Sequence, residues 1–325
     1  MNVRLGYVAM SVHVVNASPS QTMTAKQFAL ISDREAGLRK LERIAEENLH
    51  NCMRLLYHNR AYDITFFRLS SRLIPLVGHE LTEGWEYRSH LAKAFRELGD
   101  VAIKDGVRLD FHPDHYVVLN TPRRQTLDAS LAALDHYVWM LKALGISPVH
   151  RCVLHVGGAY KNKEKAIQQF IKNWSQVPEE TRQCILLEND DKAFTAKDTV
   201  ELCETLGIPM VLDLHHHRCN YEEEENEVYA LLPRIIDTWR TSSLPPKMHI
   251  SSPRSKEDFR AHADYIDPED LFPFLRRIAA YTDQLDVMIE AKRKDDALLS
   301  LMEWVGSRGG QEGIRMIDQA SFQIK

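Results

Sequence analysis

The sequence predicts an α/β fold, a single (β/α)8 TIM barrel whose active site lies at the carboxyl-terminal face of the strands. Eight short apolar runs alternate with longer segments in which apolar residues recur at three- and four-residue intervals. No linker or compositional break separates these units. Apolar strands covered by helices indicate a parallel sheet buried on both faces, and eight such units favour a closed barrel. An open doubly wound sheet is the alternative, but no GxGxxG motif follows the first or third run.

The eight runs are the expected strands in chain order. They are VRLGYVA (3–9), CMRLLYH (52–58), VRLDFH (107–112), RCVLHV (151–156), CILLEN (184–189), PMVLDL (209–214), KMHIS (247–251) and LDVMIEA (285–291). The segments between them predict helices over 34–52, 89–106, 126–145, 163–177, 195–207, 228–240 and 270–281. We expect the barrel domain over residues 1–300 and a loosely ordered C-terminal tail over 301–325, because the segment after Trp304 is polar.

Composition excludes several classes of protein. The chain has 325 residues, 44% hydrophobic and 27% charged, which rules out a disordered or low-complexity protein. It contains neither a long uncharged apolar stretch nor the layout of a signal peptide, so we expect no membrane span. The five cysteines are scattered without a CxxC motif, which is typical of a reduced, cytoplasmic protein. The net charge of −5 argues against nucleic-acid binding through bulk positive charge, but not against a locally basic or metal-bearing face.

Histidines and carboxylates fall at the carboxyl ends of six successive expected strands. One such residue is more often a hydrogen-bonded structural group, but a converging set would repel or stay poorly solvated without a cation among its members. Imidazoles and carboxylates without cysteine suit Zn²⁺, Mn²⁺ or a related ion, and eight ligands fit two or three ions better than one. The expected ligands are His112, His155, Glu188, Asp213, His216, His249, His262 and Glu290.

Two or three metal ions at one site favour phosphodiester hydrolysis. Paired ions activate a water molecule and hold both the attacking and the leaving oxygen of an in-line displacement. We expect Glu188 and Glu290 to be the catalytic carboxylates that bridge the ions or orient the water.

Eight segments, taken together and in order, resemble the UV damage endonuclease family. They are FRLSSRLIPLVGHE (67–80), DFHPDHYVVLN (110–120), LHVGG (154–158), LEND (187–190), VLDLHHH (211–217), KMHIS (247–251), HADYI (262–266) and MIEAKRKD (288–295). The resemblance implies a barrel related to endonuclease IV that cuts DNA immediately 5′ of cyclobutane dimers, (6-4) photoproducts and some other lesions, including abasic sites. It also implies 3′-hydroxyl and 5′-phosphate products and a three-metal site that favours Mn²⁺, with Zn²⁺, Co²⁺ or Mg²⁺ as alternatives.

The resemblance implies metal ligation by the same eight residues and adds two more. His79 lies in the VGHE loop after the second expected strand and is implied to be a further metal-site residue. Lys247 lies two positions before His249, so both side chains point into the barrel. The matching lysine of the family can be carboxylated and ligate metal, which makes Lys247 the third implied catalytic residue. A neutral or salt-bridged barrel lysine is the alternative.

The resemblance also implies residues that contact the lesion. The family usually reads His-Pro-Gly-Gln-Tyr after the third strand, and its Gln and Tyr wedge into the duplex. Here Tyr116 matches, whereas Asp114 and His115 depart from the pattern. Ser11 stands where an Asn is often found, which puts that phosphate contact in question. The implied DNA or lesion contacts are Tyr7, Ser11, His115, Tyr116, Lys292 and Lys294.

The expected partner is damaged double-stranded DNA, recognised by distortion and flipped bases with little sequence preference. We expect a cytoplasmic monomer, nucleoid-associated when it acts on DNA, without a membrane or an obligatory protein partner. Three alternatives stay open from the residues alone. They are a metal-dependent sugar isomerase of the same barrel type, an endonuclease that prefers abasic sites, and a damage-binding protein without catalysis. The intact ligand set counts against the last of these.

Overall fold

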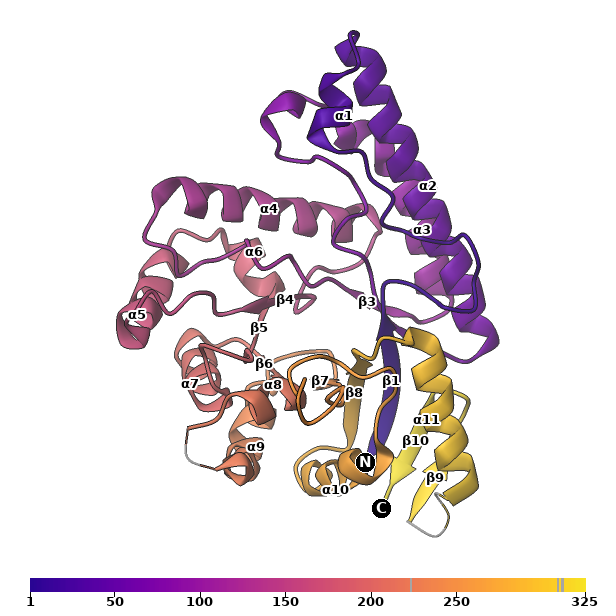
Figure 1. The fold of residues 1–325 in the computed structure, drawn as a ribbon, viewed down its shortest axis with the longest axis vertical. Helices are drawn as coiled ribbons and strands as arrows, with labels where there is room; N and C mark the ends of the chain where they lie inside the picture. The colour runs from indigo at the N-terminus through magenta and orange to yellow at the C-terminus, as the bar shows by residue number, and fades with distance from the viewer. Residues whose placement is uncertain (223, 309, 311–312) are drawn as a thin grey trace.

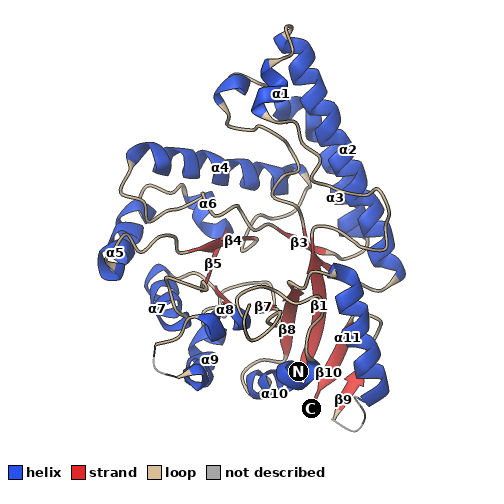
Figure 2. Cartoon of the chain, viewed as in Figure 1, coloured by secondary structure: helices blue, strands red, loops and turns tan. Residues whose placement is uncertain are grey.

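A computed structural model describes residues 1–222, 224–308, 310 and 313–325. Eight parallel strands form its centre in the order β3-β2-β1-β8-β7-β6-β5-β4. Helices lie outside these strands, as Figures 1 and 2 show. The barrel strands are β1 (Asn2–Val8), β2 (Phe66–Arg68), β3 (Arg108–Asp110), β4 (Cys152–His155), β5 (Ile185–Glu188), β6 (Met210–Asp213), β7 (Lys247–Ile250) and β8 (Gln284–Ile289).

The helices occupy the connections between the strands, except that α11 follows β8. The α-helices are α1 (Ala25–Ala29), α2 (Arg34–Ala61), α3 (Tyr87–Lys104), α4 (Arg124–Ala143), α5 (Lys163–Trp174), α6 (Glu179–Cys184), α7 (Ala196–Leu206), α8 (Leu214–Cys219), α9 (Val228–Asp237), α10 (Pro268–Ile278) and α11 (Lys294–Arg308). Two short 3-10 turns are η1 (Glu80–Thr82) and η2 (Glu225–Glu227). None of the described helices is both long and apolar enough to cross a membrane.

The barrel closes between β3 and β4, the two ends of the strand order. Phe111 pairs with Cys152 in a parallel bridge, and its N–H donates to the Arg151 carbonyl at 2.8 Å. The Val153 N–H donates to the Phe111 carbonyl at 3.0 Å. These bonds complete the ring, so the predicted (β/α)8 barrel is confirmed.

Alternation along the strands decides which side chains enter the barrel. Successive residues of a strand point to opposite faces, so a residue at the carboxyl end shares the interior with the residue two positions earlier. Val153 precedes His155 in this way, and Leu186 precedes Glu188; both apolar residues are fully buried and belong to one small cluster. An apolar layer therefore lies below the polar groups on this side of the barrel.

The second strand was predicted in the wrong place. Residues 52–58 lie inside α2, and the second strand is β2 at Phe66–Arg68. Cys52, Leu55 and Leu56 are buried while Tyr57 is exposed, which is helical rather than strand spacing. The run continues the amphipathic pattern of the residues before it, and the short true strand lies outside it.

The C-terminal tail is ordered where it is described, contrary to the prediction. β9 (Ile314–Met316) pairs with β10 (Ser321–Ile324), and β10 pairs antiparallel with β1. Phe322 and Ile324 are buried, so apolar burial and strand pairing fix this segment. The two termini lie side by side (Figure 1), and the Met1 amino group donates to the Ile324 carbonyl at 2.8 Å. Residues 309, 311 and 312 of the predicted tail lie outside the described residues.

Candidate metal centre

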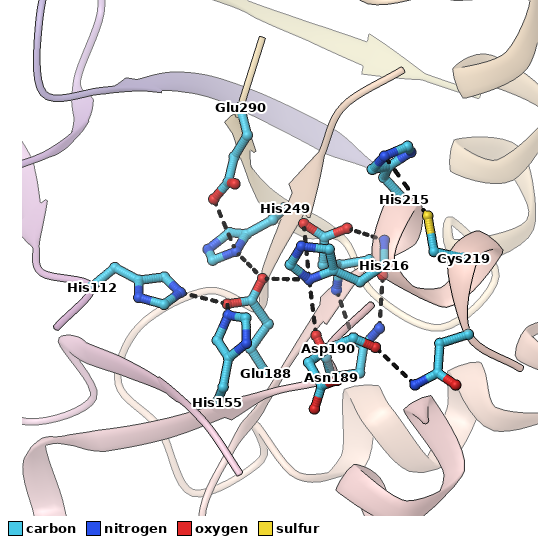
Figure 3. Close-up of polar contacts among 12 residues, drawn as sticks. His112, His155, Glu188, Asn189, Asp190, His215, His216, Cys219, His249 and Glu290 are labelled. Carbon is cyan, nitrogen blue, oxygen red and sulfur yellow. Dashed lines mark hydrogen bonds and ion pairs between the residues drawn. The ribbon is translucent and has the colours of Figure 1, made fainter. Parts of the chain in front are cut away.

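The predicted ligands lie at one end of the barrel. His155, Glu188 and Asp213 are the last residues of β4, β5 and β6, and Glu290 follows β8 directly. His249 is the third residue of β7. Figure 3 shows imidazoles and carboxylates from these strands gathered around one side chain.

Glu188 is the central residue of the cluster and is fully buried. Its Oε2 lies 2.7 Å from His112 Nε2 and 3.3 Å from His155 Nε2. Its Oε1 lies 2.8 Å from His249 Nδ1 and 3.4 Å from His216 Nδ1. Burial alone would raise the pKa of Glu188, but the electrostatic influence of the surrounding imidazoles and the hydrogen bond to His112 hold this pKa well below its usual range. The carboxylate therefore stays ionised between two sets of ligands.

Among the described residues, two groups of side chains place their ligand atoms within 4.8 Å of one another. One group contains His112, His155 and Glu188; the other contains Glu188, Asp213, His249 and Glu290. Because Glu188 belongs to both, a bridging carboxylate between two cations fits the arrangement. Imidazole and carboxylate donors of this kind suit first-row divalent ions.

Asp213 shows a buried acceptor that a cation would satisfy. Its Oδ1 accepts the His216 backbone N–H at 2.7 Å, which caps α8. Its Oδ2 is buried without a hydrogen-bond partner among the described residues. Burial raises the pKa of the Asp213 carboxyl, partly opposed by His216 and reinforced by the charges of Glu188 and Glu290. An orphaned carboxylate oxygen in this position fits the proposed use as a metal ligand.

His216 and His262 lie beside these groups, with ring centres 6.5 Å apart. His216 Nδ1 is 3.0 Å from the Asn189 carbonyl, and His262 Nδ1 is 2.7 Å from the Glu290 carbonyl. A carbonyl at Nδ1 fixes the ring and its tautomer, which leaves Nε2 as the atom that could bind metal. A third ion beside the first two would have these two nitrogens available.

Arg68 is a residue of the centre that sequence reasoning missed. Its guanidinium is buried, and Nη1 donates to Glu290 Oε1 at 2.6 Å, while Nη2 lies 2.6 Å from His249 Nε2. Burial lowers the pKa of His249 to about 4, so this imidazole is neutral, accepts from Arg68 at Nε2 and donates from Nδ1 to Glu188. Arg68 is the last residue of β2, a position like that of the ligands at the ends of their strands. It was missed because the second strand was predicted at residues 52–58 instead.

Lys247 lies below the ligands in a buried network of charges. Its Nζ donates to Asp110 Oδ2 at 2.6 Å. Burial lowers the pKa of the Lys247 ammonium to about 8, although Asp110 opposes the shift. Arg108 donates to Asp286 at 2.6 Å in the same layer. The sequence pattern did not single out Asp110 or Arg108, because their roles depend on partners from other strands.

Three further predicted site residues, His79, Tyr7 and Ser11, lie outside the two ligand groups. His79 precedes η1, and its Nδ1 accepts the Leu81 N–H at 3.1 Å; His79 belongs to neither ligand group. Tyr7 is fully buried and donates to Asn59 Oδ1 at 2.7 Å, so the structure does not place it at the barrel surface. The Ser11 hydroxyl donates to Asp295 and thereby holds the loop after β1.

Four of the predicted DNA contacts lie after β3 and β8. His115 and Tyr116 follow β3, and their rings are 6.2 Å apart. Both are exposed, Tyr116 by 63%. Lys292 is exposed, whereas Lys294 is half-buried near Glu290, and burial lowers the pKa of Lys294.

The fold and the site define a class: a TIM-barrel protein with a histidine and carboxylate centre at the carboxyl ends of its strands. Residues 3–323 match the family model of UV-endonuclease UvdE. A UV DNA damage endonuclease of Halalkalibacterium halodurans is 51% identical over 304 residues, covering 93% of this chain and 94% of that protein. The chain therefore belongs to the UV-endonuclease UvdE family and is a DNA repair endonuclease, which confirms the resemblance.

Solved structures agree with this assignment. The crystal structure of SacUVDE has a TM-score of 0.81 at 26% identity and covers 94% of this chain and 99% of that one. Endonuclease IV from Thermus thermophilus has a TM-score of 0.50 at 15% identity, covering 94% of this chain and 99% of that one. The second match shows a shared fold alone.

Proposed function

We propose that this protein is a metal-dependent endonuclease that hydrolyses the phosphodiester immediately 5′ of UV photoproducts. The substrates are cyclobutane dimers and (6-4) photoproducts, with abasic sites as a further lesion class, and the products carry 3′-hydroxyl and 5′-phosphate ends. The observation that carries the proposal is Glu188, which belongs to both groups of side chains able to hold a metal ion.

Divalent ions, with Mn²⁺ as the expected species and two or three per chain, would supply an activated water and neutralise charge on the phosphate. Glu188, which belongs to both ligand groups, would help to hold two of them. The two carbonyl-anchored imidazoles, His216 and His262, would bind a third through Nε2. His79 is proposed as an accessory metal-site residue, with its Nδ1 already used by Leu81.

Glu290 and Arg68 would act as a pair. The guanidinium holds the Glu290 carboxylate in place and lowers the pKa of this carboxyl against the burial that would raise it. Glu290 therefore stays ionised, as a metal ligand or a carboxylate that orients water must be. Arg68 also supplies a fixed positive charge beside the reacting phosphate.

Lys247 is proposed to be carboxylated in the active protein. A lysine must lose its proton to react with carbon dioxide, and the lowered pKa of Lys247 makes the neutral amine accessible. Arg68 Nε and both Nε and Nη2 of Arg108 are buried donors without a hydrogen-bond partner among the described residues. Oxygens of a carboxylated lysine could accept from such donors. Mass spectrometry of the intact protein at neutral pH tests this step.

DNA binding is proposed at the face that carries these residues. His115 and Tyr116 would enter the duplex where damaged bases leave the stack. Lys292 and Lys294 would contact phosphates, and Ser11 would contact the backbone only after releasing Asp295. Tyr7 would support the pocket from below rather than touch DNA, since it is buried. The protein is proposed to act as a monomer in the cytoplasm, associated with the nucleoid.

A nicking assay tests the proposed function. Supercoiled plasmid, irradiated or untreated, is incubated with the protein and Mn²⁺, and a duplex with one cyclobutane dimer maps the cut and its ends. The proposal predicts nicking of irradiated plasmid only, one cut 5′ of the dimer, and no product with chelator. Equal nicking of both plasmids, or cleavage unaffected by chelator, would overturn it.

A further inference from the structure

The loop between β4 and α5 contains a strained turn over residues 159–162. The Asn162 N–H donates to the Ala159 carbonyl at 2.9 Å, which closes the turn. Its two central residues, Tyr160 and Lys161, have φ angles of 46° and 66°. A turn with positive φ at both central positions favours Asn and Gly, and neither Tyr nor Lys adopts this conformation readily. The turn therefore persists against the preference of both residues, a pattern that concentrates at functional sites.

The surrounding residues hold this turn in place. Asn120 Nδ2 donates to the Gly158 carbonyl at 2.8 Å. Gly157 has a φ of 117°, and a Cβ there would lie 2.3 Å from Asn120 Oδ1, so the backbone approaches Asn120 too closely for any other residue. On the other side, the Asn162 side chain accepts the Lys165 N–H at 2.8 Å and caps α5. The turn is thus fixed at both ends.

The turn lies at the rim of the metal centre. It follows His155 by a few residues, and Gly157 and Gly158 line a cavity of about 300 Å³ together with His112, His115 and His155. The Tyr160 ring packs over Gly158, where a Cβ would lie 3.4 Å from two ring carbons. Tyr160 is 51% exposed, and Lys161 is exposed as well.

Exposed aromatic residues gather in the connections at this end of the barrel. Five of the seven exposed aromatic side chains among the described residues follow the carboxyl end of a barrel strand. Stacking platforms of this kind, combined with nearby cations, bind unpaired bases and the phosphate backbone. The five are Tyr116, Tyr160, Tyr221, Phe259 and Tyr265.

We infer that the 159–162 turn contacts DNA: Lys161 binds a backbone phosphate, and Tyr160 stacks on an unpaired base beside the metal centre. The inference rests on the proposed function, since it requires a duplex seated over the barrel mouth. A DNA contact would explain why the strained conformation is kept, because a relaxed turn would orient the side chains of Tyr160 and Lys161 differently.

The salt dependence of DNA binding tests the Lys161 contact. Affinity for a labelled duplex with one cyclobutane dimer is measured by anisotropy, with chelator present to prevent cleavage, at several salt concentrations. Each phosphate contact contributes about 0.9 to the slope of log affinity against log salt. Lys161→Gln should lower the slope by about that amount, whereas Lys172→Gln, an exposed lysine of α5, should leave it unchanged. An unchanged slope in Lys161→Gln overturns the turn assignment alone; a wild-type protein that binds no duplex either in chelator or in Mn²⁺ overturns this inference and the proposed function together.

A second variant separates strain from binding. Lys161→Gly should raise the thermal midpoint, because glycine adopts positive φ freely, and should still weaken DNA binding as Lys161→Gln does. A higher midpoint with wild-type affinity would show strain without a DNA contact.

Tyr160→Ala should lower the preference for damaged over undamaged duplex about tenfold, the effect of one lost stacking contact, and Tyr160→Phe should retain it. Equal preference in Tyr160→Ala and wild type would contradict the stacking role.

Discussion

The Arg68 guanidinium donates to the Glu290 carboxylate at 2.6 Å, within the group of side chains that could hold a metal ion. The fixed positive charge of Arg68 offsets the negative charge of the neighbouring carboxylates. The protein can therefore stay folded when the centre holds no metal. The same contact lies next to His249, whose Nε2 accepts from the other guanidinium nitrogen. Arg68 therefore contributes both to the stability of the barrel and to the balance of charge in the centre.

Replacing Arg68 should destabilise the metal-free protein. Arg68→Gln leaves the partly buried Glu290 without its partner, at a cost of about 3 kcal/mol in the free energy of unfolding, the lower end for breaking a buried ion pair. Mn²⁺ should restore more of the lost stability in this variant than it adds to wild type, because the ion replaces the missing charge. Urea unfolding with chelator and with Mn²⁺ measures both effects. Arg240→Gln, at an exposed ion pair with Asp237, is the control and should change neither value. A metal-free Arg68→Gln as stable as wild type would refute this role.

Glu188→Gln should abolish most of the activity. The substitution keeps the size of the side chain but removes the charge shared by the two ligand groups. We expect the nicking rate to fall by at least about 10²–10³-fold, the loss typical of one group that stabilises transition-state charge, and the bound Mn²⁺ per chain to decrease. Nicking kinetics and elemental analysis measure these. Glu97→Gln, an exposed carboxylate of α3, should behave as wild type. Near-normal turnover in Glu188→Gln would exclude a bridging role.

Tyr116→Ala should reduce lesion selectivity without affecting the fold. The ring is 63% exposed, so its removal costs little packing. If it fills the gap left by damaged bases, the ratio of cleavage rates on damaged and undamaged duplex should fall about tenfold. Tyr281→Ala is a suitable control, because Tyr281 is 46% exposed in the connection that enters β8 from the opposite end of the barrel. Unchanged selectivity in Tyr116→Ala removes the residue from lesion recognition.

Stability should depend on pH through His136. Burial lowers the pKa of this imidazole to about 3, and the ring Nδ1 lies 3.0 Å from the Tyr87 hydroxyl. In the unfolded chain the pKa of His136 is about 6.5, so below this pH the imidazole is protonated when the chain is unfolded but stays neutral in the folded protein. The free energy of unfolding therefore falls as pH falls towards 3. Wild type should lose about 1.4 kcal/mol per pH unit relative to His136→Gln below pH ~6. Urea unfolding of both proteins at several pH values measures the difference, and parallel pH profiles would contradict it.

The strand ends were predictable because two local patterns coincide. An apolar run fixes where a strand ends, and the polar residue after it must then face the barrel mouth, as Glu188 and Asp213 do. Arg68 escaped this reasoning because β2 is only Phe66–Arg68, too short to stand out beside the long apolar run within α2. Lys247 was placed on the interior face correctly, but its pairing with Asp110 depends on strands far apart in sequence.

The ordered C-terminal segment shows a different limit. A short antiparallel strand such as β10 gains its stability from β1, at the opposite end of the chain. Its burial of Phe322 and Ile324 has no local signature strong enough to separate it from a polar tail. Likewise, the turn at Tyr160 and Lys161 has no sequence signal, because both residues disfavour the conformation they adopt.

Anomalous diffraction from crystals soaked in Mn²⁺ tests the central claim most directly. We predict one peak within coordination distance of His112, His155 and Glu188 and a second within coordination distance of Glu188, Asp213, His249 and Glu290. Crystals that show no peak near Glu188, while the protein still nicks irradiated DNA in the same metal, would contradict it.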